Sequence, residues 1–333
     1  FIHYFFFGWL GVDLFFVLSG FLITNILLDV QGTSHFLRDF YIRRVLRIFP
    51  VYYLSLFILL ILLPAITEGL PTDLSFYIQN QWWFWVYLEN WLFVFFPSFK
   101  GEALSHFWSL AVEEQFYLVW PFIIMVLKKP KSLLVFMLAV LLAVMCIRFW
   151  LWIDKIEDLA YYNLYTFTRI DGICIGCTLA LLYRINIDFL NKYNTLIVLG
   201  LAAMNFIFYF LNGQQGFSYP YLAIAGYTTF AVMLALLVHE AVQGKNRIVN
   251  YIFTLPLLKF FGKISYSFYV FHWPVFLLLG PLINPYAERL SYEYSKLITA
   301  VIATGIGLLL SILSYYSIER YFLRLKKNYN FKP

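Results

Sequence analysis

The sequence predicts an all-α integral membrane protein, a polytopic bundle of about ten transmembrane helices. Hydrophobic residues make up 62% of the 333 residues and charged residues only 13%, whereas a typical soluble domain has roughly 45–50% and about 25%. Apolar stretches of about 20 residues, the length that crosses a bilayer as a helix, recur along the chain. The aromatic content of 22% excludes a disordered chain, because disordered segments have few aromatic residues and many charges.

Nine complete spans and one partial span are expected. The complete spans are residues 10–29, 48–66, 107–127, 133–153, 167–184, 195–211, 220–238, 264–283 and 297–317. Residues 1–7 are apolar and have no charged leader, so we expect a first helix that is truncated at the start of the chain. About sixteen residues follow the last span. We therefore expect one domain, residues 1–333, in which the bundle and its short loops perform any chemistry.

The basic residues predict the orientation, since Lys and Arg accumulate on the cytoplasmic side of short loops. Alternating spans place 18 of the 24 basic residues on one side, and that side includes the C-terminus. They are Arg38, Arg43, Arg44, Arg47, Lys128, Lys129, Lys131, Arg184, Lys192, Lys245, Arg247, Lys259, Lys263, Arg320, Arg324, Lys326, Lys327 and Lys332. We expect this side to be cytoplasmic.

The aromatic segment 82–97 has the apolar character of a further span. Counting it as one would move Lys128, Lys129 and Lys131 to the outside. We therefore predict that it is an interfacial or re-entrant segment on the non-cytoplasmic face, where tryptophan rings prefer to lie.

Ionisable side chains inside apolar spans cost about 2.5–3.5 kcal/mol each on insertion scales, so they indicate function. His3 and Asp13 are expected near the outer ends of the first two helices, where they can face each other. The carboxylate would then fix the imidazole tautomer and raise its basicity for proton abstraction. The alternative is that a backbone carbonyl satisfies His3 and that Asp13 caps the second helix.

Arginines mark the cytoplasmic mouth of the bundle. Arg44 and Arg47 are three residues apart, hence on one helix face, and Arg43 adjoins them. Their guanidinium groups suit the phosphates of a nucleotide-like ligand. The alternative is that they determine the topology or bind anionic lipid headgroups.

Two adjacent carboxylates, Glu113 and Glu114, lie early in the apolar span 107–127. Successive helical positions point about 100° apart, so these two cannot share one partner. One can face a polar interior, while the other needs a cation or a proton. Because a purely structural pair would be costly, we favour a functional role.

Two further polar sets lie in later spans. Arg169 and Asp171 are two residues apart and do not face each other on a helix, so we expect each to bond to another span. Tyr266, Tyr269 and His272 recur at three-residue spacing and form one polar stripe. The alternative for both sets is hydrogen bonding that merely joins helices.

Five strings, in this order, resemble the family-three membrane acyltransferases, which O-acetylate bacterial surface polysaccharides and related acceptors. The strings are GVDLFFVLSGFLIT (11–24), YIRRVLRIFPVYY (41–53), FWSLAVEEQFYLVWP (107–121), RIDGICIGCTLAL (169–181) and SYSFYVFHWPV (265–275). The resemblance implies a ten-helix bundle in the bacterial inner (plasma) membrane. Such a bundle takes an acyl group, usually acetyl, from cytoplasmic acyl-CoA and passes it to a hydroxyl on the far side.

Carried over by motif, the resemblance makes His3 the catalytic base, Glu113 the acidic element, and Arg44 and Arg47 the paired arginines of the donor end. We hypothesise that acetyl-CoA phosphates bind these arginines together with Arg43, and that His3, oriented by Asp13, deprotonates the acceptor. Further substrate-binding or oxyanion candidates are Ser19, Glu114, Tyr117, Arg169, Asp171, Tyr266 and His272.

The expected partners are acyl-CoA, a cell-surface glycan or lipid-linked saccharide as acceptor, and membrane lipids, with no nucleic acid. No metal is expected, since the five histidines show no ligand spacing. The rival function is a proton-coupled transporter or flippase, in which Glu113 would carry protons. Against it, no inverted repeat is visible in the sequence. A third possibility is a non-enzymatic membrane scaffold.

Overall fold

The computed structural model describes residues 10–66, 72–96, 104–154, 159–185, 189–211, 225–292 and 294–329. Nearly all of these residues are helical and none lies in a β-strand, which confirms the all-α class. His3 and the partial first span fall outside the described residues.

Among the described residues, six helices are long and apolar enough to cross a membrane. They are α1 (Leu10–Val30); Phe36–Ile66, which joins α2 (Phe36–Phe57), the π-helical η2 (Ile58–Leu62) and α3 (Leu63–Ile66); Ser105–Leu127, which joins η3 (Ser105–Phe107) and α7 (Trp108–Leu127); α8 (Pro130–Ile153); α15 (Pro256–Leu290); and Ser295–Leu325, which joins α16 (Ser295–Ser314), the π-helical η6 (Tyr315–Glu319) and α17 (Arg320–Leu325). The expected number of about ten is therefore not confirmed.

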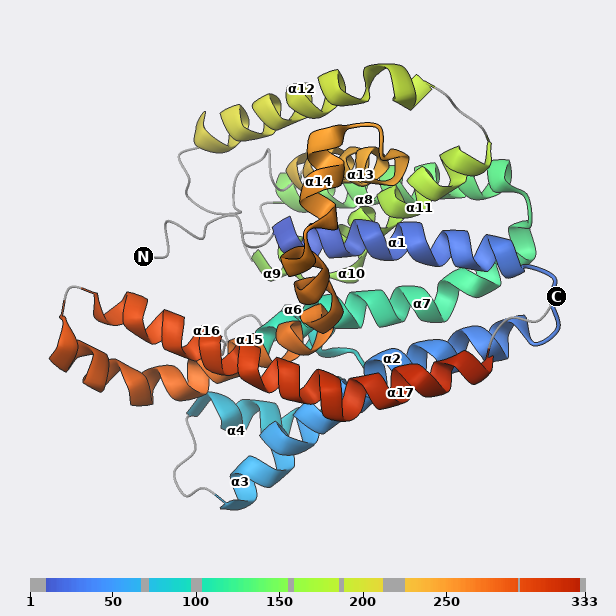
Figure 1. The fold of residues 1–333 in the computed structure, drawn as a ribbon. Helices are drawn as coiled ribbons and strands as arrows, with labels where there is room; N and C mark the ends of the chain where they lie inside the picture. The colour runs from blue at the N-terminus through green and yellow to red at the C-terminus, as the bar shows by residue number, and fades with distance from the viewer. Residues whose placement is uncertain are drawn as a thin grey trace.

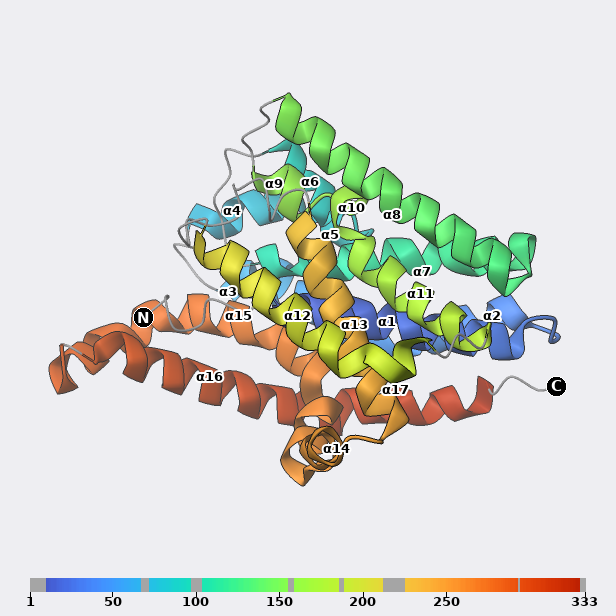
Figure 2. The ribbon, with the colours of Figure 1, turned by 90° about the horizontal axis from the view of Figure 1, so that it is seen from above.

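Three further helices run beside these six: α11 (Asp171–Arg184), α12 (Phe189–Leu211) and α13 (Tyr227–Gln243) (Figures 1 and 2). The 14 residues of α11 reach about 21 Å at about 1.5 Å per residue, less than the roughly 30 Å of a hydrocarbon core. The short α10 (Thr166–Arg169) precedes it. The span expected at 167–184 is thus two helices with a break at Ile170.

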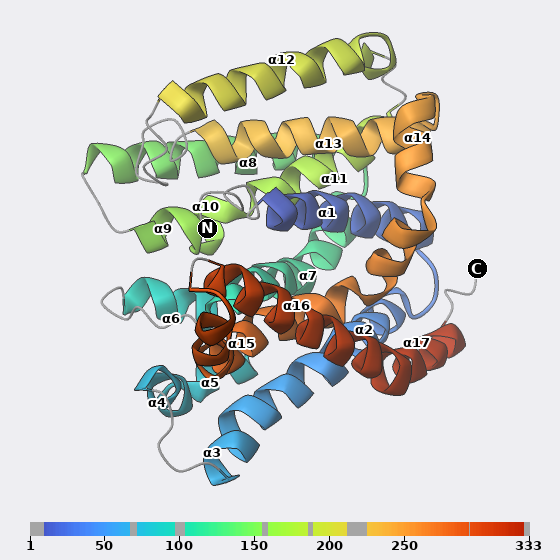
Figure 3. The same cartoon turned by 60° about the vertical axis from the view of Figure 1, so that its left-hand side comes forward.

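The helices alternate in direction, so that their connections gather at two ends of the bundle. The α1–α2 connection, α14 (Arg247–Thr254) and the end of α17 lie at one end in Figure 3. We call this the basic end, because Arg38, Arg247 and Arg324, which the sequence predicts to be cytoplasmic, lie in the elements that meet there. The opposite end carries α4 (Thr72–Gln79), α6 (Glu89–Phe95) and α9 (Leu159–Asn163) (Figure 3).

The aromatic segment folds as α5 (Gln81–Trp85), a turn and α6, and neither helix is long enough to span a bilayer. Polar contacts join it to the bundle. Asn90 Nδ2 donates to Thr166 Oγ1 at 2.8 Å, and Gln115 Nε2 donates to the carbonyl oxygen of Tyr87 at 2.8 Å. The segment is therefore fixed against both α7 and α10.

A very close helix contact lies between α1 and α11, where glycines let the two backbones touch. A Cβ atom on Gly20 would lie 2.0 Å from the carbonyl oxygen of Ile173, and one on Gly176 would lie 2.1 Å from that of Val17. Gly172 and Gly176 form a GxxxG pattern, which permits such close approach in membranes. The conformational freedom of glycine plays no part here, since only the missing side chain matters.

We predict that Gly176→Ala will destabilise the protein, because the added methyl group meets backbone that cannot move aside. Overpacking typically costs about 1–3 kcal/mol, and a backbone clash places this variant at the upper end. Gly305→Ala in α16 is the matched control, since nothing lies within 4 Å of its Cβ position. Thermal unfolding in detergent should show a lower Tm for Gly176→Ala alone. Equal Tm values for both variants would contradict the contact.

Candidate active site

At the basic end, α2 brings Arg44, one of the three expected arginines, against Tyr117 of α7. The Arg44 guanidinium carbon lies 5.1 Å from the ring centroid of Tyr117 and 5.8 Å from that of Phe40. Within the described part of the chain, neither Arg44 nor Arg47 forms an ion pair with a carboxylate. Arg43 Nη1 donates to the carbonyl oxygen of Tyr329 at 3.3 Å. Arg44 and Arg47 are therefore cations without a direct carboxylate partner among the described residues.

Tyr117 connects these arginines with the two candidates Ser19 and Glu113. Its hydroxyl forms a hydrogen bond with Ser19 Oγ of α1 and donates to Glu113 Oε1 at 3.4 Å. Glu113 is only 1% exposed. Glu113 and Tyr117 are four residues apart on α7, so they lie on one helix face. Glu114 is the next residue on α7 and therefore lies on a different face of the helix from Glu113. Its buried Oε1 has no hydrogen-bond partner.

The polar stripe expected on α15 is present and faces α2 and the start of α7. The Tyr266 hydroxyl donates to the carbonyl oxygen of Ile48 at 2.6 Å. The Tyr269 hydroxyl lies 2.6 Å from Ser109 Oγ and donates to the carbonyl oxygen of His106. Ser109 thus joins α15 to α7.

Two histidines meet beside this stripe. The ring centroids of His106 and His272 are 5.4 Å apart. His272 Nδ1 lies 2.8 Å from the carbonyl oxygen of Tyr269 and 3.1 Å from that of Phe268. Carbonyl oxygens only accept, so Nδ1 carries a proton and the neutral ring keeps a lone pair on Nε2. Both ring nitrogens of His106 are buried without a hydrogen-bond partner.

The two clusters are joined by one face of α7. Ser109, Glu113 and Tyr117 recur at four-residue spacing and are all buried. Eight residues of helix span about 12 Å. This α7 stripe therefore leads from the arginines of the basic end to the histidine pair, with contacts to α1, α2 and α15 on the way.

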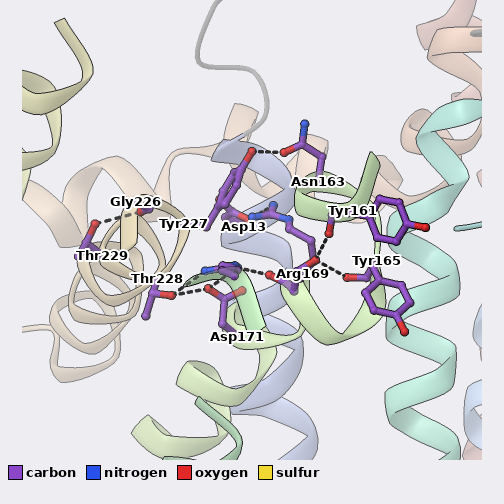
Figure 4. Close-up of polar contacts among 12 residues, drawn as sticks. Asp13, Tyr161, Asn163, Tyr165, Arg169, Asp171, Gly226, Tyr227, Thr228 and Thr229 are labelled. Atoms are coloured by element: carbon purple, nitrogen blue, oxygen red, sulfur yellow. Dashed lines mark hydrogen bonds and ion pairs between the residues drawn. The ribbon is translucent and has the colours of Figure 1, made fainter. Parts of the chain in front are cut away.

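Asp13 has a different described partner from the one expected. Its Oδ1 lies 2.5 Å from Arg169 Nη2 (Figure 4), and both side chains are 3% exposed. The expected contact with His3 lies outside the described residues. The alternative in which Asp13 caps a helix is wrong, because Asp13 lies within α1, which begins at Leu10.

A second buried ion pair completes this network. Arg148 Nη2 of α8 lies 2.9 Å from Asp171 Oδ2, and Thr228 Oγ1 donates to the same carboxylate oxygen at 2.7 Å. The ring of Tyr227 lies 3.9 Å from the Arg169 guanidinium carbon (Figure 4). Arg169 and Asp171 do bond to different elements, α1 and α8. Two cations and two anions balance, so this network holds helices together and offers no net charge to a ligand.

Sequence reasoning missed a polar group on the aromatic segment. The Tyr52 hydroxyl donates to the carbonyl oxygen of Phe84 at 2.8 Å and lies 3.1 Å from Glu89 Oε1. Tyr87 stacks on Tyr52 at 4.3 Å between ring centroids, has a positive φ of 55°, and buries its hydroxyl without a hydrogen-bond partner. Burial raises the pKa of the Glu89 carboxyl and of the Tyr87 hydroxyl. The Tyr87 hydroxyl therefore keeps its proton at neutral pH, and the Glu89 carboxyl holds its proton more tightly than an exposed glutamate does.

Other missed residues carried weaker signals. His106 directly precedes the third motif string, and Arg148 is an isolated charge in the span expected at 133–153. Either could have been found by asking which ionisable groups interrupt an apolar run. Nothing in the sequence indicated that Arg148 pairs with Asp171.

We predict that Asp13→Asn will destabilise the protein strongly, because it leaves Arg169 charged and buried without its anion. Removing one partner of a buried pair costs about 3–5 kcal/mol. Asp29→Asn, in the same helix, is the control, since its ion pair with Arg184 is solvent-exposed and such pairs contribute about 0–1 kcal/mol. Unfolding in SDS titrations should separate the two variants. Equal losses would show that burial of the first pair is unimportant.

The family model of an acyltransferase domain matches residues 1–316. The chain is 32% identical over 303 residues to the peptidoglycan O-acetyltransferase OatA of Listeria monocytogenes, covering 83% of this chain and 46% of OatA. It is 30% identical over 333 residues to the putative peptidoglycan O-acetyltransferase YrhL of Bacillus subtilis, covering 94% of this chain and 50% of YrhL.

The chain thus spans about half the length of the curated relatives it matches. No solved structure matches it. Because the family match covers residues 1–316 and so takes in all five motif strings, the resemblance is confirmed and the chain belongs to the family of membrane acyltransferases.

Proposed function

We propose that the protein is a membrane O-acetyltransferase that takes an acetyl group from acetyl-CoA at the basic end and passes it to a hydroxyl of a cell-envelope saccharide. The observation that carries this proposal is the α7 stripe, which connects unneutralised arginines with a histidine pair through a buried carboxylate. Such buried polar groups are costly inside a membrane protein and indicate a substrate path.

The donor binds at the arginines. CoA is a polyanion confined to the cytoplasm, and the basic end is the end that the distribution of Lys and Arg makes cytoplasmic. Arg43, Arg44 and Arg47 bind its phosphates through charge-assisted hydrogen bonds. The pantetheine arm then enters the bundle, and the thioester reaches the α7 stripe. The enclosing membrane is the bacterial inner membrane, with the C-terminal end of the described chain on the cytoplasmic side.

The transfer step uses an imidazole as base. The acceptor hydroxyl gives its proton to a ring nitrogen while its oxygen bonds to the acyl carbon. The carbon–sulfur bond then breaks, and CoA leaves as a thiolate that takes up a proton. In the free protein Glu113 accepts a hydrogen bond from the Tyr117 hydroxyl. When the thioester is in place, the Tyr117 and Ser19 hydroxyls rotate away from these hydrogen bonds and donate to the oxyanion.

Two histidines are candidates for that base. The first is His3, which the resemblance to the family implies. His272 is the second candidate, since its Nδ1 donates to backbone carbonyls and its Nε2 keeps a lone pair. A base and a residue that binds the acceptor differ in kinetics, because loss of the base lowers kcat whereas loss of uniform binding raises KM.

The acceptor is a saccharide hydroxyl of the cell envelope. The relatives OatA and YrhL carry names that specify peptidoglycan, and we propose peptidoglycan or its lipid-linked precursor as the acceptor of this chain. The test is acetyl transfer in proteoliposomes that contain the purified protein, acetyl-CoA labelled in the acetyl group, and peptidoglycan fragments. Mass spectrometry should find the labelled acetyl ester on the saccharide. Saccharide movement without any acetyl transfer would identify a transporter or flippase instead.

We expect Arg44→Ala to raise the KM for acetyl-CoA by at least about tenfold, since one hydrogen bond to a charged group contributes about 1.5–3 kcal/mol. The control is Arg184→Ala, an arginine at the same end whose partner Asp29 is on the surface. Its KM should equal that of the wild type. If both variants bind acetyl-CoA normally, the arginines of α2 only determine the membrane topology.

We expect replacement of the base by alanine to lower kcat by about 10²–10⁴ with little change in KM, the usual contribution of general base catalysis. His3→Ala and His272→Ala are compared in the proteoliposome assay, with His35→Ala as control because His35 lies in the α1–α2 connection at the basic end. If His3→Ala and His272→Ala both keep the wild-type kcat, neither histidine is the base.

A further inference from the structure

The described chain ends with a short turn, η7 (Lys326–Tyr329), that packs against α2 beside its arginines. The hydrogen bond from Arg43 Nη1 to the carbonyl oxygen of Tyr329 fixes the turn there. Lys326 follows directly after the last candidate span and is half-buried. The last described turn of the chain therefore lies beside the site at which the donor is proposed to bind.

Lys326 lies within electrostatic reach of all three α2 arginines. Burial, followed by the positive charges of Arg44, Arg47 and Arg43, lowers the pKa of the Lys326 ammonium from 10.5 to about 8. Four cations therefore converge at one place, and their mutual repulsion opposes the fold. A bound anion would reduce the repulsion between these four cations and so stabilise their arrangement.

Among the described residues, no carboxylate forms an ion pair with Lys326, Arg44 or Arg47. The charged groups on the two elements packed against η7 are Arg38, Asp39, Arg43, Arg44 and Arg47 of α2 and Arg320 and Arg324 of α17. Asp39 is the only acid among them, and it pairs with Arg38. From farther away, Glu113 and Glu114 act on Arg44, and Glu319 acts on Arg47. Among the described residues, no carboxylate lies within ion-pair distance of Lys326.

We propose that Lys326 is a fourth cation of the donor site, that it binds a phosphate of the acyl-CoA together with Arg44 and Arg47, and that it takes up a proton when the phosphate binds. This inference rests on the proposed function and adds a residue that none of the motif strings contains.

The direction of the proton movement follows from the charges. A bound phosphate neutralises the arginines and favours the charged form of the lysine. Below pH 8 the lysine is already protonated in the free protein, so binding is strongest there and changes no protonation. Near pH 8 about half of the molecules take up a proton on binding. Above pH 8 the affinity falls as pH rises, because the proton must be supplied at increasing cost.

The experiment is calorimetric titration of acetyl-CoA into the full chain in nanodiscs of zwitterionic lipid, at pH 8.0, in two buffers of different ionisation enthalpy. The wild type should take up about half a proton. Lys326→Arg should bind within about twofold of the wild type without proton uptake, because arginine keeps its charge at this pH. Lys326→Met should bind about five- to tenfold more weakly, also without uptake, which corresponds to one lost charge contact. Lys128→Met, an exposed lysine at the same end, should behave as the wild type.

The outcomes separate the possible failures. Wild-type affinity and proton uptake in Lys326→Met would overturn the role of Lys326 while leaving the proposed function intact. Absence of acetyl-CoA binding to the wild type would overturn the proposed function itself. A repeat in nanodiscs of anionic phospholipid tests a lipid headgroup as the source of the phosphate. Loss of anionic lipid binding in Lys326→Met, with acetyl-CoA binding unchanged, would overturn the assignment to the donor.

Discussion

The interior of this bundle has to satisfy its own polar groups, because the surrounding hydrocarbon offers no hydrogen bonds and no counter-ions. That constraint explains the two arrangements found there. Near the end opposite the basic end, the two charges within the Asp13–Arg169 pair and within the Arg148–Asp171 pair neutralise each other. These pairs join α1, α8, α10 and α11. Along α7, by contrast, the buried carboxylates Glu113 and Glu114 have no ion-pair partner among the described residues. The first arrangement has the character of a structural support, and the second that of a site for substrate.

The helix α7 organises the site because its buried face repeats every four residues. Ser109 contacts α15 through Tyr269, and Tyr117 contacts α1 through Ser19 and α2 through Arg44. One polar face on an otherwise apolar helix therefore forms a continuous row of polar side chains that runs from the basic end toward the other end of the bundle.

Much of this arrangement follows from the sequence, and the reasons for the rest are physical. Hydropathy predicts the all-α class, and three-residue spacing predicts the stripe of Tyr266, Tyr269 and His272. The partner of Asp13 was not predictable, since Arg169 is 156 residues away and only tertiary packing brings the two together. Lys326 resembled any basic residue after a span. The break between α10 and α11, which hydropathy does not detect, accounts for one expected span that does not meet the length criterion. The apolar stretches in α12 and α13 are also too short to meet it.

The backbone contact between α1 and α11 constrains how this protein could adapt during evolution. Two helices that touch at Gly20 and Gly176 cannot separate, slide or rotate without losing that fit, and the ion pairs tie α8 to the same group. One wall of the site is thereby invariant in shape. Lineages that accept larger acyl chains or bulkier sugars would have to gain room on the opposite wall, formed by α2 and α15, at positions other than those proposed to bind the donor or to accept the proton.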